Sequence, residues 1–197
     1  MSIFNPMKAL KSDRKSEIIH VAARLFRERG YSAVTMRDLA TDLGIKAASL
    51  YNHITSKQQI LSEIILVIAE EFTDGIEEIA AMDADATVKL KKVVAQHISL
   101  TSENPFGMAA LNNDWMHLED KLEYYQQLRN QYEKRFREIV LAGQQAGELK
   151  GVSHEILLFS ILSTLRNLYL WIPKKEDLKK DKLIEDLSEI LLQGVVR

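Results

Sequence analysis

The chain has 197 residues, enough for one substantial core or two small domains, and 46% of them are hydrophobic while only 3 are proline. This composition favours an all-α globular protein, and the absence of cysteine excludes disulfides and thiolate metal sites. The net charge of −2 hides a split, because residues 1–60 contain 10 Lys and Arg against 5 Asp and Glu and the remainder is acidic. Such splits arise by chance, but this one also suits a protein that binds nucleic acid at one end.

The N-terminal 29 residues predict an arm followed by a helix. Lys8 and Lys11 lie in the arm, where they could touch DNA phosphates or remain solvated. Asp13 is the expected cap of a helix that runs to about Arg29 with apolar residues on one face, and Gly30 ends it.

The stretch from Thr35 to Lys57 predicts two short helices around a glycine turn. Thr35 and Asp38 have the spacing of a capping box, and Gly44 supplies the left-handed conformation that turns the chain. The second helix, about Lys46 to His53, buries Leu50 and presents polar and small residues. This arrangement describes a helix-turn-helix, whose second helix enters the major groove of DNA.

Apolar residues at helical spacing predict six further helices, at about residues 57–81, 85–102, 108–117, 121–146, 153–173 and 178–195. A capping-box signature at Thr55 and Gln58 opens the first of them. The most apolar stretch, Ile156–Ile172, is short and polar for a membrane span because it contains Arg166 and Asn167. In the last helix, a stripe of Leu183, Leu187 and Ile190 predicts a dimer contact.

Residues 30–61, GYSAVTMRDLATDLGIKAASLYNHITSKQQIL, resemble the DNA-binding domain of tetracycline-repressor-like (TetR-family) regulators. The resemblance implies an all-α protein of about nine helices. A three-helix helix-turn-helix domain at residues 1–56 would be joined to a ligand-binding and dimerisation domain at residues 57–197. The two C-terminal helices of each subunit would form the homodimer interface, and an effector would change the separation of the DNA-binding domains. The residues that fall where the family contacts DNA are Arg37, Lys46, Ala47, Ala48, Ser49, Tyr51, His53 and Lys57.

The side chains at these positions suggest different roles. Arg37 is the best bidentate base reader, while Lys46 suits a guanine or a phosphate. Ala47 and Ala48 allow close approach to thymine methyl groups or simply favour a helix. Tyr51 and His53 are expected to hold the backbone, and Lys57 does so with the start of its helix.

Aromatic, Met and polar residues of the C-terminal part suggest a roomy apolar pocket with a few polar groups. The candidate ligand-binding residues are His97, Phe106, Met108, Trp115, Tyr124, Tyr125 and Arg166. Each of the aromatic and Met residues also suits an ordinary core, and Arg166 could pair across a dimer interface. The C-terminal segments are weakly similar to regulators of fatty-acid or sterol degradation, which sense acyl-CoA thioesters, so an acyl-CoA-like or other lipid-derived effector is favoured.

The sequence therefore predicts a cytoplasmic, ligand-responsive regulator, a repressor released from palindromic operator DNA by its effector. The alternative is a DNA-binding regulator or architectural protein without a small-molecule switch. The chain has no nucleophile-elbow, phosphate-loop or H-E-x-x-H motif, so no enzyme is expected. No metal site is expected, since the histidines are scattered. No cofactor and no membrane partner are expected either.

Overall fold

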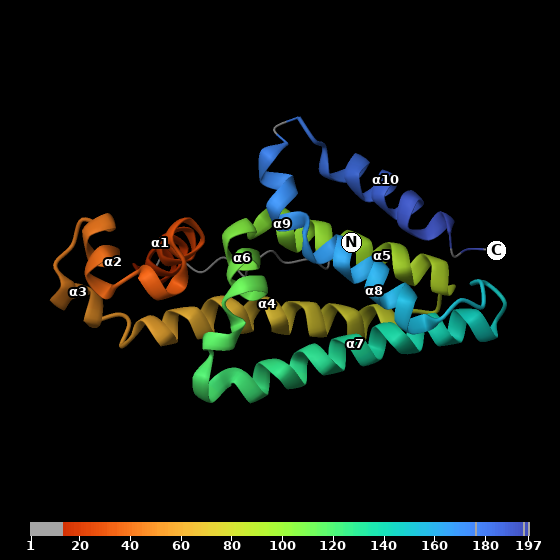
Figure 1. Ribbon diagram of the computed structural model, residues 1–197, viewed down its shortest axis with the longest axis horizontal. Coiled ribbons are helices and arrows are strands. Elements are labelled where there is room, and N and C mark those ends of the chain that lie inside the picture. Colours follow the sequence, from red (N-terminus) through yellow and green to blue (C-terminus); the bar gives the residue numbers. More distant parts are fainter. Residues whose placement is uncertain (1–13, 176, 195, 197) are drawn as a thin grey trace. The chain divides into compact units, whose positions relative to one another are not determined.

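The computed structural model describes residues 14–175, 177–194 and 196, and the N-terminal arm and the predicted cap Asp13 lie outside these ranges. Within them the chain is helical and forms no strand, with an isolated antiparallel bridge between Leu149 and Val196 (Figure 1). The prediction of an all-α protein is confirmed.

The helices follow the predicted order closely. The N-terminal elements are α1 (Arg14–Arg29), the 3₁₀ turn η1 (Tyr31–Ala33), α2 (Met36–Asp42), α3 (Ala47–Tyr51) and α4 (Lys57–Ala80). Then come α5 (Ala86–Glu103), α6 (Pro105–Asn113), the 3₁₀ turns η2 (Trp115–His117) and η3 (Glu119–Lys121), and α7 (Leu122–Gln145). The last are α8 (His154–Arg166), α9 (Leu168–Trp171), η4 (Ile172–Lys174) and α10 (Lys180–Gln193). Because only Asn167 separates α8 from α9, these two correspond to one predicted helix, and the expected helix count is confirmed for the described residues.

Helix α6 begins earlier than predicted. Asn104 leaves the helical conformation at φ −132°, and Pro105 then occupies the first position of α6. Proline is well suited to this position, because the first amide of a helix has no intrahelical acceptor and the ring fixes a helical φ. The Asn104–Gly107 segment is thus a sharp junction between two helices.

The chain divides into two compact units. The first unit comprises the described residues up to Val67 together with Phe106–Leu122, and the second comprises Ile68–Pro105 and the residues from Glu123 onward. In the first unit, the fully buried side chains include Ile18 and Phe26 of α1, Leu39 of α2 and Leu50 of α3. Ile54 is also fully buried, at the turn into α4.

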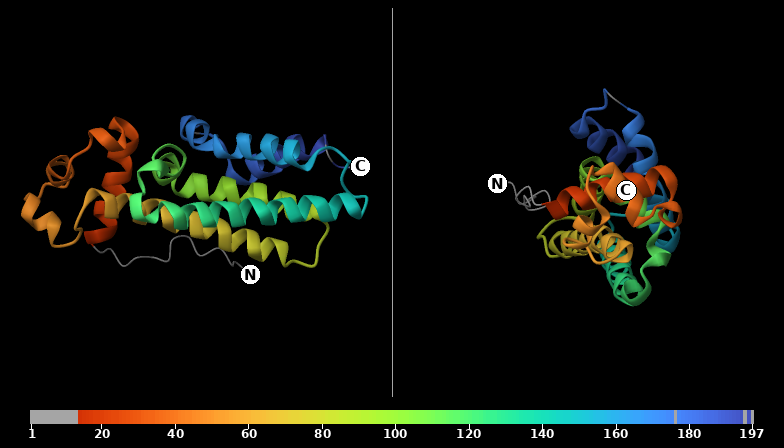
Figure 2. Two further views of the ribbon diagram at one scale, coloured as in Figure 1. Left: turned by 60° about the horizontal axis from the view of Figure 1, so that its bottom comes forward. Right: turned by 90° about the vertical axis from the view of Figure 1, so that its left-hand side faces the viewer.

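In the second unit, α5 is the central helix. Helices α8, α9 and α10 and the turn η4 all pack against it, and Figure 2 shows α8 and α10 beside it in a second view. Helices α4 and α7 are joined by side-chain bonds such as that from Arg135 to Glu77. By length and composition alone, His154–Lys174 could cross a membrane. In this unit, however, it is interrupted at Asn167, and Leu157, Ile161 and Leu165 are buried as in a core helix.

Candidate functional site

The start of α2 is fixed by a reciprocal cap. The Asp38 amide donates to Thr35 Oγ1 at 3.2 Å, and the Asp38 carboxylate accepts from the Thr35 amide at 2.8 Å, as the capping box predicts. These hydrogen bonds hold the pKa of the Asp38 carboxyl below its usual range. The first helix of the motif therefore begins at a defined residue.

The turn between α2 and α3 has the predicted geometry. Gly44 has a φ of +65°, a left-handed conformation that a side chain would strain. Lys46 then takes an extended conformation as the N-cap of α3. Helix α2 packs on α3, with Leu39, Ala40 and Leu50 buried, so the outer face of α3 is held in one orientation.

Most of the predicted DNA-binding side chains lie exposed around this motif. Arg37, Lys46, Ala48, Tyr51 and His53 are exposed, and Tyr51 keeps 52% of its surface accessible although it is aromatic. Ala47 and Ser49 are half-buried. The exposed set combines two cations with a phenol and an imidazole, which are donors suited to phosphate and to base edges.

Lys57 differs from the other predicted contacts because its ammonium is already bonded within the first unit. Its Nζ donates to the carbonyl oxygens of Tyr31 and Val34, each at 2.8 Å, and lies 4.2 Å from the centre of the Tyr31 ring. Burial lowers its pKa. Lys57 therefore ties the start of α4 to η1, and a DNA contact here would come from the helix end rather than from a free ammonium.

The cap of α4 is displaced by one residue from the predicted pair, Thr55 and Gln58. The Gln59 amide donates to Ser56 Oγ at 3.0 Å, while Gln59 Oε1 accepts from the Thr55 amide at 2.9 Å. Ser56 and Gln59 are thus the residues that close the start of α4. Both pairs satisfy the same spacing rule, so the sequence alone did not separate them.

Gln58 is free for another role, which sequence reasoning missed. Its Oε1 accepts from the Tyr31 hydroxyl at 2.7 Å, and its Nε2 donates to the His117 carbonyl oxygen. The His117 ring also stacks on Tyr31, with ring centres 5.1 Å apart. The turn η2 is therefore attached to η1 and α4 inside the first unit.

Three of the predicted ligand-binding residues belong to this first unit. Phe106 lies against α1, with its ring 5.8 Å from His20 and 5.5 Å from the Arg27 guanidinium. Met108 is buried, and Trp115 is half-buried. These contacts place Phe106 against α1, the first helix of the first unit.

The other four predicted ligand-binding residues lie in the second unit, and three are close together. His97 and Tyr125 are buried, and Arg166 donates to Glu133 at 2.7 Å. The Arg166 charge acts on both His97 and Tyr125. Tyr124 is 43% exposed and donates to Glu70 at the surface. His97, Tyr125 and Arg166 therefore lie in one region of the second unit, and Tyr132 lies there too because its hydroxyl contacts His97. Tyr124 lies at the surface instead.

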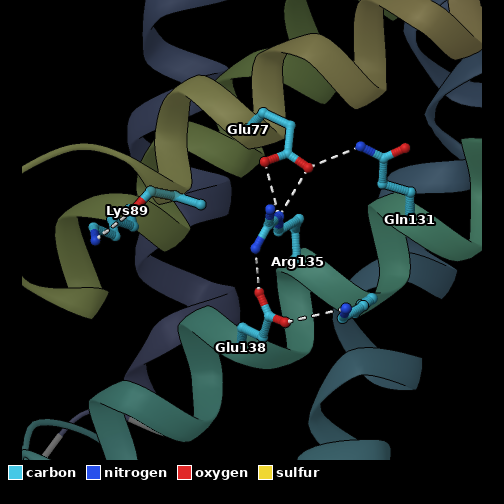
Figure 3. Close-up of polar contacts among 7 residues, drawn as sticks. Glu77, Lys89, Gln131, Arg135 and Glu138 are labelled. Carbon is cyan, nitrogen blue, oxygen red and sulfur yellow. Dashed lines mark hydrogen bonds and ion pairs between the residues drawn. The ribbon is translucent and has the colours of Figure 1, made fainter.

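A surface hollow of about 310 Å³ lies elsewhere in the second unit. Its lining consists of Glu77, Ala80, Ala81, Lys89, Arg135, Glu138, Ile139 and Ala142, none of them predicted. Figure 3 shows that its cationic groups already have partners: Arg135 donates to Glu77 and to Glu138, each at 2.8 Å, and Lys89 donates to the Ala80 carbonyl oxygen. Three of the residues that line the hollow are therefore alanines, and its Lys and Arg side chains already have hydrogen-bond partners within the protein.

Two family models match the chain. One, described as bacterial regulatory proteins of the tetR family, matches residues 18–64, and the other, described as the tetracyclin repressor-like C-terminal domain, matches residues 83–195. The second match alone covers more than half of the chain. The chain belongs to the tetracycline repressor (TetR) family.

Individual relatives agree with the TetR assignment. The HTH-type transcriptional repressor KstR2 from Rhodococcus jostii (strain RHA1) is 26% identical over 188 residues, covering 94% of this chain and 92% of that protein. The structure of the ketosteroid transcriptional regulator KstR2 of Mycobacterium tuberculosis has a TM-score of 0.88 at 20% identity, covering 94% and 96% of the two chains. AibR, solved in complex with isovaleryl coenzyme A and operator DNA, has a TM-score of 0.75 at 20% identity, covering 90% and 97%.

The family settles the general role of the chain. It is a TetR-family transcriptional regulator with a DNA-binding helix-turn-helix, as the sequence predicted. The two structural likenesses establish the fold. The DNA-binding and ligand-binding residues stay predictions, and they are developed as proposals below.

Proposed function

We propose that this chain is a ligand-responsive repressor that binds palindromic operator DNA as a homodimer and is released by a small, largely apolar effector. The observation that carries the proposal is the outer face of α3 and its surroundings. Arg37, Lys46, Tyr51 and His53 are exposed there, on a motif whose cap and turn are fixed by Asp38 and Gly44. A DNA-binding regulator of this kind acts in the cytoplasm, where bacterial DNA lies.

The effector proposal rests on the relatives and on the second unit. KstR2 is described as a ketosteroid regulator, and AibR was solved with isovaleryl coenzyme A. The second unit of this chain contains a mostly apolar core with a few buried polar groups, including His97 and Gln96. We therefore infer an acyl-CoA-like or other lipid-derived effector, and no catalysis.

The homodimer proposal rests on apolar side chains that face solvent in one protomer. Ile156 and Phe159 of α8 are 65% and 73% exposed, and Ile190 of α10 is 70% exposed. Leu183, from the predicted dimer stripe, is buried within its own protomer. Both helices pack on α5, so a second copy of the chain would cover these exposed side chains with its own α8 and α10.

Selection of binding sites from random-sequence DNA, with the full-length protein, tests the DNA-binding proposal. We expect an inverted repeat with one protomer on each half. In fluorescence anisotropy with the selected DNA, Arg37→Ala should change base preference, whereas Tyr51→Phe should weaken all sequences alike. Selection of an asymmetric site bound by one protomer would contradict the proposal, and DNA binding that no metabolite affects would favour a regulator without a switch.

Light scattering tests the dimer. Phe159→Asp places a charge on the exposed face of α8, and we expect it to yield monomers with unchanged circular dichroism. Val88→Asp is the matched control, because Val88 is an exposed apolar residue of α5 outside α8 and α10. An unchanged mass for Phe159→Asp would remove α8 from the interface.

A further inference from the structure

Buried polar atoms without partners are concentrated on one helix of the second unit. Among the described residues, Gln96 Oε1, His97 Nδ1 and Thr101 Oγ1 of α5 are buried and make no hydrogen bond. Most buried polar groups in proteins are paired, because an unpaired one has lost its water without compensation. Three such atoms within two turns of α5 therefore call for an explanation.

Gln96 has a structural role that accounts for its position. Its Nε2 donates to the carbonyl oxygens of Glu71 and Phe72, at 3.0 Å and 3.2 Å, and so joins α5 to α4. Its amide group lies directly over Gly75, where any side chain would collide with it. The remaining two atoms, on His97 and Thr101, have no comparable role.

His97 is a neutral imidazole with one nitrogen in use. Its Nε2 lies 2.8 Å from the Tyr132 hydroxyl, and burial lowers the pKa of His97 to about 3. Burial also raises the pKa of Tyr132, which keeps the phenol protonated. A protonated phenol can donate to Nε2, and with that direction we assign the ring proton to Nδ1. His97 Nδ1 is thus a buried donor without an acceptor among the described residues.

Thr101 lies one helical turn after His97 on the same face of α5 and is fully buried. Its hydroxyl differs from those of Thr73 and Thr41, which also lie in helices. Thr73 donates to the Ala69 carbonyl oxygen at 2.8 Å, and Thr41 donates to that of Arg37 at 2.9 Å. The Thr101 hydroxyl has no such bond, so it too is available as a donor.

The surroundings of these two donors restrict what they could bind. The Phe72 ring lies 4.5 Å from the His97 ring, and the nearby Arg166 is already paired with Glu133. Both donors are themselves uncharged, so they would compensate a buried charged ligand group only weakly. A neutral oxygen acceptor on an apolar molecule meets both donors without that cost.

We propose that His97 Nδ1 and Thr101 Oγ1 form the subsite that binds the carbonyl oxygen of an acyl thioester effector. The subsite rests on the proposed function, since it assigns the effector's polar group to named atoms. The competing location is the surface hollow lined by Glu77, Arg135 and Ala142, whose polar contacts Figure 3 shows. Arg135 is paired there with Glu77 and Glu138, and none of the side chains that line the hollow has a buried polar atom that lacks a partner among the described residues.

Calorimetric titration of the full chain with matched probes tests the subsite. The probes are isovaleryl and octanoyl coenzyme A, and their S-alkyl thioether analogues, which lack only the carbonyl oxygen. We expect the wild type to bind at least one thioester about three- to tenfold more tightly than its thioether, the contribution of a neutral hydrogen bond. Ala142→Leu, which fills the hollow of Figure 3, should leave this preference unchanged.

Two pairs of variants separate the subsite from general effects on folding. Thr101→Val should remove the preference for the thioester without lowering the melting temperature, because its hydroxyl is unpaired. Thr73→Val should lower the melting temperature and keep the preference, because its hydroxyl is paired and buried. His97→Asn, which keeps a donor near the position of Nδ1, should retain the preference, whereas His97→Gln, which keeps the Tyr132 side, should lose it.

Each negative outcome has a distinct meaning. Equal binding of thioester and thioether, binding of none of the thioesters, or loss of the preference in Ala142→Leu would overturn the subsite. A thioether that releases operator DNA as well as the thioester would overturn the subsite while the proposed repressor function stands. A thioester preference that depends on Thr101, in a protein that selects no DNA sequence, would uphold the subsite and contradict the proposed function.

Discussion

At the scale of single residues, the close approach of α5 to α4 and the burial of His97 are the features with the clearest energetic consequences. Gly75 leaves room for the Gln96 amide, which bonds two carbonyl groups of α4. His97 is 4% exposed and neutral inside the same unit. Both positions depend on neighbours on another helix, so their substitution tests tertiary packing rather than helix propensity.

The first prediction concerns pH. The unfolded chain has a histidine pKa near 6.5, whereas that of His97 in the folded protein is about 3. Because the folded pKa is depressed, the unfolded state binds more protons between these values. The stability from this group is complete above about pH 6.5 and is lost as pH falls towards 3, at up to about 1.4 kcal/mol per pH unit.

Urea unfolding measures this effect. Between about pH 7 and about pH 5.5, the wild type should lose about 1 kcal/mol more free energy of unfolding than His97→Gln. The same substitution at the exposed His20 is the control. Parallel pH dependence of the wild type and His97→Gln would show that His97 takes up a proton without unfolding.

The second prediction concerns Gly75. Alanine normally stabilises a helix interior by about 1 kcal/mol relative to glycine. Here the added methyl group would collide with the buried amide of Gln96, and overpacking of this kind costs about 1–3 kcal/mol. We expect Gly75→Ala to lower the free energy of unfolding in urea, and to do so less when Gln96 is also alanine. A stabilised Gly75→Ala variant would contradict the packing.

At the scale of elements, the side chain of Gln58 in α4 links η1 to the turn η2. Gln58 accepts from the Tyr31 hydroxyl and donates to the His117 carbonyl oxygen. Lys57, next to it, bonds two carbonyl groups around η1. The first turn of α4 is therefore the place where three elements of the first unit are joined.

The third prediction follows from that junction. Gln58→Ala should raise amide hydrogen exchange in residues 115–122, because η2 loses the hydrogen bond from Gln58 to the His117 carbonyl oxygen. Exchange in α2 should not change, since its cap at Thr35 and Asp38 is separate. Exchange measured by mass spectrometry distinguishes the two segments. A uniform increase across the first unit would indicate general destabilisation instead.

At the scale of the whole molecule, the uneven charge distribution leads us to expect DNA binding that weakens with salt. The protein is acidic overall, but Arg37 and Lys46 are exposed at the helix-turn-helix. In the proposed dimer, a phosphate contact from Lys46 of each protomer would contribute about −2 to the slope of log affinity against log salt. The residues after position 60 are net acidic, so we expect them to repel DNA phosphates.

The fourth prediction uses that slope. Lys46→Ala should flatten it by about 2, one unit for each protomer, and should weaken binding to all DNA sequences. Anisotropy titrations over a range of potassium chloride concentrations measure the slope. A changed base preference with an unchanged slope would instead make Lys46 a base contact.

Local features of the fold could be predicted from the sequence because their causes are local. The cap at Thr35 and Asp38 and the turn at Gly44 depend on residues within one or two turns, and both formed as predicted. The cap of α4 was displaced because Thr55 with Gln58 and Ser56 with Gln59 satisfy the same rule. The break between α8 and α9 falls at Asn167, a polar residue that made this stretch unsuitable as a membrane span but was not predicted to interrupt the helix.

The ligand-binding candidates were harder to predict because they depend on which helices meet. Phe106 was assigned to a pocket from its residue type, whereas its neighbours in the first unit are His20 and Arg27 of α1. Tyr124 and Tyr125 were predicted together, although adjacent residues of a helix point about 100° apart. The buried stripe of Tyr125, Leu128 and Tyr132 would have separated them. The bond between His97 and Tyr132 joins residues 35 apart and leaves no mark in either local pattern.

The segment Phe106–Leu122 belongs to the same compact unit as the helix-turn-helix, although the chain builds 38 residues of the second unit before reaching it. During synthesis on the ribosome, the DNA-binding part is therefore incomplete when its own helices have emerged. It must wait for Met108 and Leu118, which are buried there, and for the His117 carbonyl that Gln58 binds. A nascent chain stopped before residue 122 thus lacks the segment that completes the first unit, which can be finished only after Ile68–Pro105 of the second unit has been translated.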